Sequence, residues 1–81
     1  MYPDLTVKEN LLYAGRLTLP AGTISEEIAE LAEEVMASLG LRRIANSLVG
    51  DERRRGISGG EKKRVNVGIE LMKKPKLLFL E

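Results

Sequence analysis

Apolar residues recur every three or four positions in three stretches of the chain, and Gly or Pro follows each stretch. The first stretch precedes Pro20 and Gly22, the second precedes Gly40, and the third precedes Pro75. This spacing places apolar side chains along one face of a helix, and Gly and Pro interrupt helices. The pattern therefore restricts the chain to a small, mainly α-helical fold whose helices bury their apolar faces against one another.

The predicted helices cover residues 6–19, 24–39, 42–48 and 59–73, and residues 76–80 form one predicted strand. The expected inner faces are Val7, Leu11, Leu12, Ala14 and Leu17 in the first helix, Ile24, Ile28, Leu31, Val35 and Leu39 in the second, and Val65, Gly68, Ile69 and Met72 in the last. The glutamates of the second helix are expected to form a solvated face.

Capping residues predict where these helices begin and end. Thr6 and Glu9 have the spacing of a capping box, in which each side chain accepts the backbone N–H of the other residue. Either Thr23 or Ser25 caps the second helix, and Gly40 ends it. The helix boundaries are thus predicted independently of the apolar pattern.

Composition excludes several classes of function. The chain has 81 residues, enough for one small domain, and contains neither Cys nor His. A disulfide framework, a Cys/His zinc site and His-based acid–base catalysis are therefore excluded. A net charge of +1 and an aromatic content of 4% argue against binding to nucleic acid. No apolar run reaches the roughly 18 residues of a spanning helix, and the N-terminus does not resemble a signal peptide.

The sequence Ser58-Gly59-Gly60-Glu61, here called the glycine turn, opens the last predicted helix. Ser58 and Glu61 have the spacing of a second capping box. The first amides of a helix have no intrahelical partner, and together with the helix dipole they can bind an anion. Glycine would let a phosphate approach the backbone closely. Taken alone, these four residues favour a capped helix that binds no ligand.

The longer stretch ISGGEKKRVNVGIELMKKPKLLFL resembles the signature motif of ATP-binding-cassette (ABC) transporter ATPases, with its following helix and the run into the Walker B strand. The family pattern is L-S-G-G-Q, and Glu61 takes the place of the Gln. The stretch MYPDLTVKENLLYAGRLTLP resembles the segment after the Q-loop of the same family. GDERRRGISGGEKKRVNVGIEL is typical of the G (White-type) branch. The resemblance covers essentially the whole chain.

The resemblance implies a role for each residue of the glycine turn. Ser58, Gly59 and Gly60 would contact the γ-phosphate of an ATP molecule held by the Walker A loop of a second cassette. Glu61 would orient the turn, or meet the ribose or water, and capping is the preferred role because a carboxylate repels ATP. Ile57 would anchor the turn by packing.

The resemblance also implies cofactors and partners. The parent protein would use ATP and Mg²⁺, and would sit at the cytoplasmic face of a membrane with a transmembrane domain and a second nucleotide-binding domain as partners. No nucleic acid is expected. No catalytic residue is assigned, because the Walker A loop, the Q-loop Gln, the catalytic Glu and the switch His all lie outside this sequence. The chain alone is expected to be soluble, to bind neither cofactor tightly and to be inactive as an ATPase.

Residues 1–75 are assigned to a helical subdomain, cut from the parent α/β core together with a truncated Walker B strand at residues 76–81. Glu81 stands where the family has its metal-associated Asp, but it is not assigned as a magnesium ligand. Leu80-Glu81 is interpreted either as native sequence or as the remnant of a cloning site.

Two other interpretations compete with this one. In the first, the chain is a stand-alone helical module that binds a protein, and the glycine turn only caps a helix. In the second, a helix-turn-helix unit binds nucleic acid through residues 53–55 and 62–64, which are all basic. Arg53, Arg54 and Arg55 are also compatible with a solvated loop, or with contact to a transmembrane domain or lipid headgroups.

Overall fold

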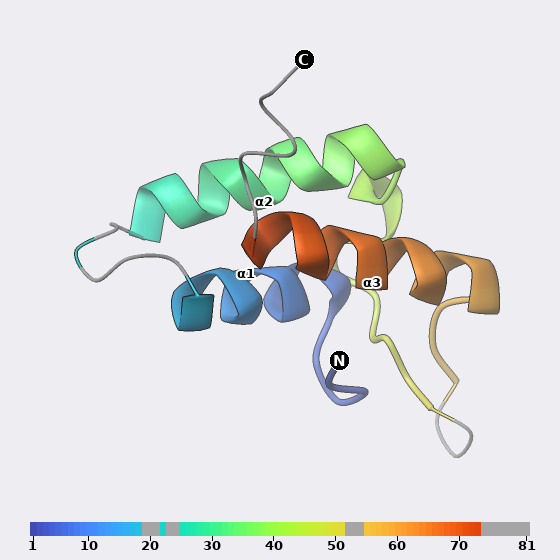
Figure 1. The fold of residues 1–81 in the computed structure, drawn as a ribbon. Helices are drawn as coiled ribbons and strands as arrows, with labels where there is room; N and C mark the ends of the chain where they lie inside the picture. Colours follow the sequence, from blue (N-terminus) through green and yellow to red (C-terminus); the bar gives the residue numbers. More distant parts are fainter. Residues whose placement is uncertain (19–21, 23–24, 52–54, 74–81) are drawn as a thin grey trace.

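The computed structural model describes residues 1–18, 22, 25–51 and 55–73, and this part of the chain is mainly helical. It contains the α-helices α1 (Val7–Thr18), α2 (Ser25–Leu39) and α3 (Gly59–Lys73), and the short 3₁₀-helix η1 (Arg42–Ile44) (Figure 1). The predicted fold class is therefore confirmed. The predicted strand at 76–80 and the candidate cap Thr23 lie outside the described residues.

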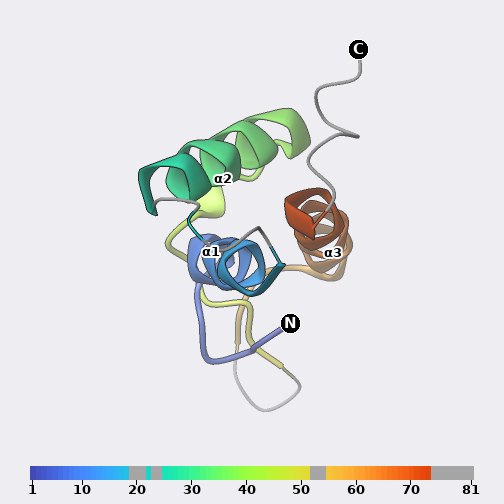
Figure 2. The same cartoon turned by 60° about the vertical axis from the view of Figure 1, so that its left-hand side comes forward.

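The three α-helices pack around one interior, and each contacts the other two (Figure 2). Apolar side chains from all three, and from the segment between α2 and α3, form the core: Val7, Leu11, Ala14, Ile28, Leu31, Ala32, Val35, Met36, Leu41, Val49, Ile57, Val65 and Met72. Gly68 lies where the helices meet, because a Cβ built on it would be 3.1 Å from both Leu11 Cδ2 and Val35 Cγ1. The inner faces predicted for α2 and α3 are thus largely confirmed.

One predicted core residue of α1 is wrong. Leu17 is 67% exposed, whereas Val7, Leu11 and Ala14 are buried. At about 100° per residue, Leu17 lies roughly 90° from the middle of the face that these residues share. The apolar spacing of the sequence includes it, but the packed face of the helix does not.

The start of α1 is satisfied by its own capping box and by a distant segment. The Thr6 N–H donates to Glu9 Oε1 at 2.9 Å, and the Glu9 N–H donates to Thr6 Oγ1 at 3.1 Å. The Val7 N–H donates to the Ser47 carbonyl at 3.0 Å and the Lys8 N–H to the Ala45 carbonyl at 2.9 Å. Every amide in the first turn of α1 therefore has a partner within the chain.

The predicted helix at 42–48 is wrong, because only Arg42–Ile44 is helical and it forms a single 3₁₀ turn. Beyond Ala45 the backbone pairs instead with the residues that precede α1. Thr6 and Leu48 form an antiparallel bridge, and the Val49 N–H donates to the Leu5 carbonyl at 3.1 Å. A helix would direct these groups along its own axis, so the tertiary pairing replaces it.

A glycine turns the chain at the end of α2, as predicted. Gly40 has a φ of +69°, which L side chains rarely adopt. The Leu41 N–H reaches back to the Met36 carbonyl at 2.8 Å, and the Gly40 N–H lies 3.4 Å from the Ala37 carbonyl, the two bonds of a Schellman motif. Leu41 is fully buried, so η1 follows α2 in a defined direction.

Candidate functional site

The glycine turn forms the predicted capping box at the start of α3. The Ser58 N–H donates to Glu61 Oε1 at 2.9 Å, and the Glu61 N–H donates to Ser58 Oγ at 3.1 Å. The Lys62 N–H makes the first regular helical bond, to the Ser58 carbonyl at 2.9 Å. Ser58 is therefore the N-cap, and Gly59 and Gly60 are the first two residues of the helix.

The amides of Gly59 and Gly60 differ from those at the start of α1. The equivalent amides of α1, at Val7 and Lys8, are covered by carbonyls of the 45–47 segment. No carbonyl or side chain in the described part of the chain accepts a hydrogen bond from Gly59 or Gly60, and both residues are exposed. The two helices share the same cap, but only α3 presents open N–H donors to an external anion.

The chain's own packing does not account for glycine at these two positions. Neither Gly59 nor Gly60 has a positive φ, and a Cβ built on either would meet no atom within 4 Å. Glycine in a helix costs about 1 kcal/mol relative to alanine. Glycine at these two positions therefore has no explanation in the packing of the described residues.

The residues before the glycine turn attach it to the core. Ile57 is buried, as expected, and its N–H lies between the carbonyls of Leu48 and Val49, at 3.2 and 3.3 Å. Gly56 packs so closely on the Val49 carbonyl that any Cβ would overlap it. Residues 48–50 and 56–57 therefore run side by side (Figure 1). This pairing holds the glycine turn in place.

Glu61 is the charged residue of the glycine turn. The Ser58 backbone N–H, followed by the Ser58 hydroxyl and the positive charges of Arg43 and Arg64, lowers the pKa of the Glu61 carboxyl below its ordinary value. Glu61 is thus a carboxylate at neutral pH. Its second oxygen, Oε2, lies 3.7 Å from Nη2 of Arg43, which belongs to η1.

Arg43 was missed by sequence reasoning. It lies far from Glu61 along the chain and belongs to no recognised spacing, so only the fold brings the two together.

Asn10 was also given no role, although its buried side chain accepts from the Tyr2 N–H at 2.7 Å and donates to the Tyr2 and Thr6 carbonyls, each at 3.0 Å. A polar residue on the apolar face of α1 was the signal that could have found it.

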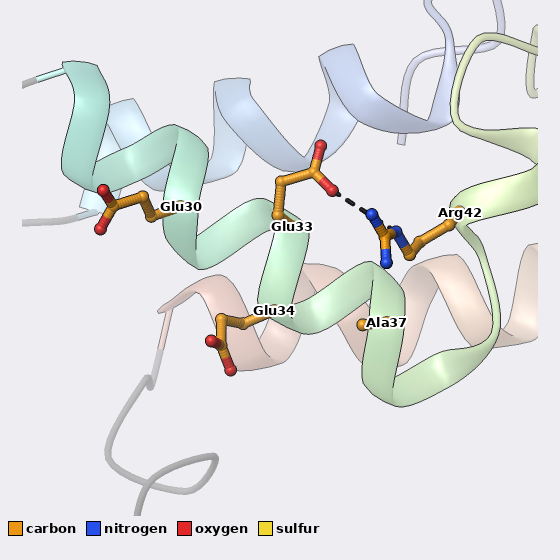
Figure 3. Close-up of a pocket in the computed structure, with 5 residues that line it drawn as sticks. All are labelled: Glu30, Glu33, Glu34, Ala37 and Arg42. Carbon is orange, nitrogen blue, oxygen red and sulfur yellow. Dashed lines mark ion pairs between the residues drawn. The ribbon is translucent and has the colours of Figure 1, made fainter.

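A separate hollow lies on the outer face of α2, with a volume of about 410 Å³. Figure 3 shows Glu33 in an ion pair with Arg42, at 3.7 Å between Oε2 and Nε, while Glu30 and Glu34 extend in other directions. These glutamates are exposed, which confirms the predicted solvated face. The hollow is open and mostly acidic, and the glycine turn does not line it.

The remaining predicted residues lie apart from the turn or outside the described part. Arg55 is exposed, whereas Arg53, Arg54 and Glu81 lie outside the described residues. Among the described residues no group of three or more acidic side chains is placed to hold a metal ion. No helix in that part of the chain is long and apolar enough to cross a bilayer.

Comparison with known proteins identifies the family of the chain. A family model described as ABC transporter matches residues 1–81. ABC transporter G family member 14 of Arabidopsis thaliana is 48% identical over all 81 residues, and G family member 5 of Oryza sativa subsp. japonica is 42% identical over the same length. The ABC-type transporter claG of Penicillium crustosum is 42% identical over 79 residues, or 98% of the chain.

The chain covers only a small part of these relatives. It spans 12% of the Arabidopsis protein, 10% of the rice protein and 11% of the Penicillium protein. The matches to the two plant proteins span the helices and the glycine turn alike, since they cover the whole chain. The chain belongs to the ABC transporter family, and its resemblance to the G branch is confirmed by relatives named as G family members.

Proposed function

We propose that this chain is the helical signature segment of the ATP-binding part of an ABC transporter, and that its glycine turn contacts ATP held by a second nucleotide-binding domain. The Ser58 hydroxyl and the Gly59 and Gly60 amides bind the γ-phosphate. Glu61 caps the helix and does not bind the nucleotide. In the whole protein, this ATP-binding part lies at the cytoplasmic face of a membrane. Its ATP binding and hydrolysis drive transport through a transmembrane domain.

One observation carries this proposal: the two exposed amides of Gly59 and Gly60, which have no partner in the described part of the chain and no packing reason to be glycine. A phosphate oxygen accepts hydrogen bonds from such amides and is favoured by the positive end of the helix dipole. The equivalent amides of α1, in contrast, donate to carbonyls of the 45–47 segment.

The packing of the turn supports its coupling to the rest of the protein. Ile57 is buried in the core, and Val65 and Met72 of α3 are fully buried against α1 and α2. A force on the turn is therefore transmitted to all three helices as one body. We infer that closure of two cassettes on ATP moves this helical unit and, through it, the transmembrane domain.

The turn provides only one side of a nucleotide site. Two amides and one hydroxyl do not enclose a triphosphate, and the described residues include no acidic group placed to hold Mg²⁺. We propose that the Walker A loop and the metal site lie in other parts of the assembly. We expect the isolated chain to bind Mg-ATP weakly and to hydrolyse none.

Gly60→Ala in the full-length transporter tests the proposal. The added methyl group meets no atom of the described residues within 4 Å, so the helix should become more stable, by up to about 1 kcal/mol. The same methyl group blocks the approach of a phosphate. We expect transport-coupled ATPase activity to fall at least roughly tenfold, a loss of about 1.4 kcal/mol in transition-state stabilisation.

Asn66→Ala, on the exposed face of the same helix, is the matched control and should leave ATPase activity unchanged. Unchanged activity in Gly60→Ala would contradict the proposal, because the turn would then tolerate a side chain where the phosphate is placed. Thermal unfolding of both variants shows that any loss of activity does not reflect a loss of folded protein.

A further inference from the structure

We propose that Arg43 is a positioning residue for the glycine turn: it neutralises the Glu61 carboxylate and keeps it turned away from the ATP phosphate. This inference rests on the proposed function. It means that a residue of η1, outside the signature motif, affects how the glycine turn binds ATP.

The two oxygens of Glu61 have different partners. Oε1 accepts the Ser58 N–H at 2.9 Å and closes the capping box, while Oε2 lies 3.7 Å from Arg43 Nη2. Arg43 thus pairs with Oε2, the carboxylate oxygen that does not take part in the capping box. Without it, that oxygen is free to rotate or to carry its charge toward the open amides of Gly59 and Gly60.

The position of this charge matters for an incoming phosphate. Glu61 directly follows the two open amides, and its carboxylate would repel ATP at this short range. A guanidinium on the far oxygen offsets part of that charge. Arg64, one turn along α3, also acts electrostatically on Glu61, but it forms no ion pair with it in the described structure.

The backbone of Arg43 is fixed even though its side chain is exposed. Leu41, the one residue between Gly40 and η1, is fully buried, and the Ile44 N–H donates to the Leu41 carbonyl at 3.1 Å. The Arg43 side chain is 79% exposed, and that of Glu61 is 21% exposed. Such a pair contributes little to folding stability. A functional effect of Arg43 is therefore separable from an effect on folding.

The chain provides a matched control for Arg43. Arg42 is its neighbour in η1 and also forms a 3.7 Å ion pair with a glutamate, but its partner is Glu33 on α2. Arg42→Ala removes the same number of atoms and the same charge from the same short helix. It should leave the ATP dependence of the transporter unchanged.

The test is a double-mutant cycle in the full-length transporter, with ATPase rates measured as a function of ATP concentration. Arg43→Ala should raise KM for ATP roughly two- to fivefold, the range expected for an exposed ion pair, with a smaller effect on kcat. The same substitution in a Glu61→Gln background should have no further effect, since no charge remains to be neutralised.

An equal effect of Arg43→Ala in both backgrounds would overturn the inference, because Arg43 would then act independently of the Glu61 charge. If Arg43→Ala leaves KM for ATP unchanged in the protein that retains Glu61, the inference is overturned as well. The Gly60→Ala variant separates this failure from failure of the proposed function. If Gly60→Ala abolishes activity while the cycle shows no coupling, the glycine turn binds ATP and Arg43 does not position it.

Discussion

Ser58 and Glu61 each accept the backbone N–H of the other, at 3.1 and 2.9 Å, and Thr6 and Glu9 repeat this relationship at α1 with the same two distances. The chain thus contains two equivalent capping boxes. Only the one at α3 leaves the next amides open to a ligand. This internal duplication allows the contribution of a cap to folding to be separated from its contribution to nucleotide binding.

Ser58→Ala and Thr6→Ala should destabilise the fold to a similar degree, since each removes the hydroxyl that accepts an N3 amide. We expect a loss of about 1 kcal/mol in the free energy of unfolding for each, measured by urea denaturation. In the full-length transporter only Ser58→Ala should reduce ATPase activity. Equal losses of activity in the two variants would show that the Ser58 hydroxyl acts through stability alone.

Glu61 should make folding stability depend on pH in the acidic range. Its pKa in the folded chain is lowered, chiefly by the Ser58 backbone N–H. Its contribution is therefore complete above the unfolded value of about 4.3, and it is lost as the pH falls through the lower folded value. Glu61→Gln removes this contribution. Urea denaturation between pH 2 and pH 6 should give a flatter profile for the variant, and parallel profiles would contradict the assignment.

Gly68 should not tolerate a larger side chain. A Cβ at this position lies 3.1 Å from Leu11 Cδ2 and Val35 Cγ1 and 3.3 Å from Leu39 Cδ1. Gly68→Val places a branched side chain in that contact and should lower the free energy of unfolding by about 1–3 kcal/mol.

Val67 is the control, because it is the neighbouring residue of the same helix and is 50% exposed. Val67→Ala should change the free energy of unfolding by no more than about 0.5 kcal/mol. Thermal unfolding followed by circular dichroism compares the two variants. A Gly68→Val protein as stable as Val67→Ala would contradict the packing of α3 against α1 and α2.

The local sequence was sufficient to predict α1, α2 and α3, and the caps at Thr6, Ser58 and Gly40. The capping boxes depend on residues three apart, and the turn at Gly40 depends on one residue that adopts a positive φ at little cost. Such short-range interactions can be read from neighbouring letters of the sequence. The resemblance of the glycine turn to the ABC signature motif is also a matter of local spacing, and the comparison with known proteins confirmed the family.

Only the tertiary structure decided which of these local features remain available to other molecules. The amides at the start of α1 are covered by Ala45 and Ser47, and this pairing also ended the helix predicted at 42–48. Packing left Leu17 exposed and brought Arg43 to Glu61. These outcomes depend on contacts between residues far apart in the chain, whose geometry follows from how the helices pack and cannot be obtained from spacing within any one of them.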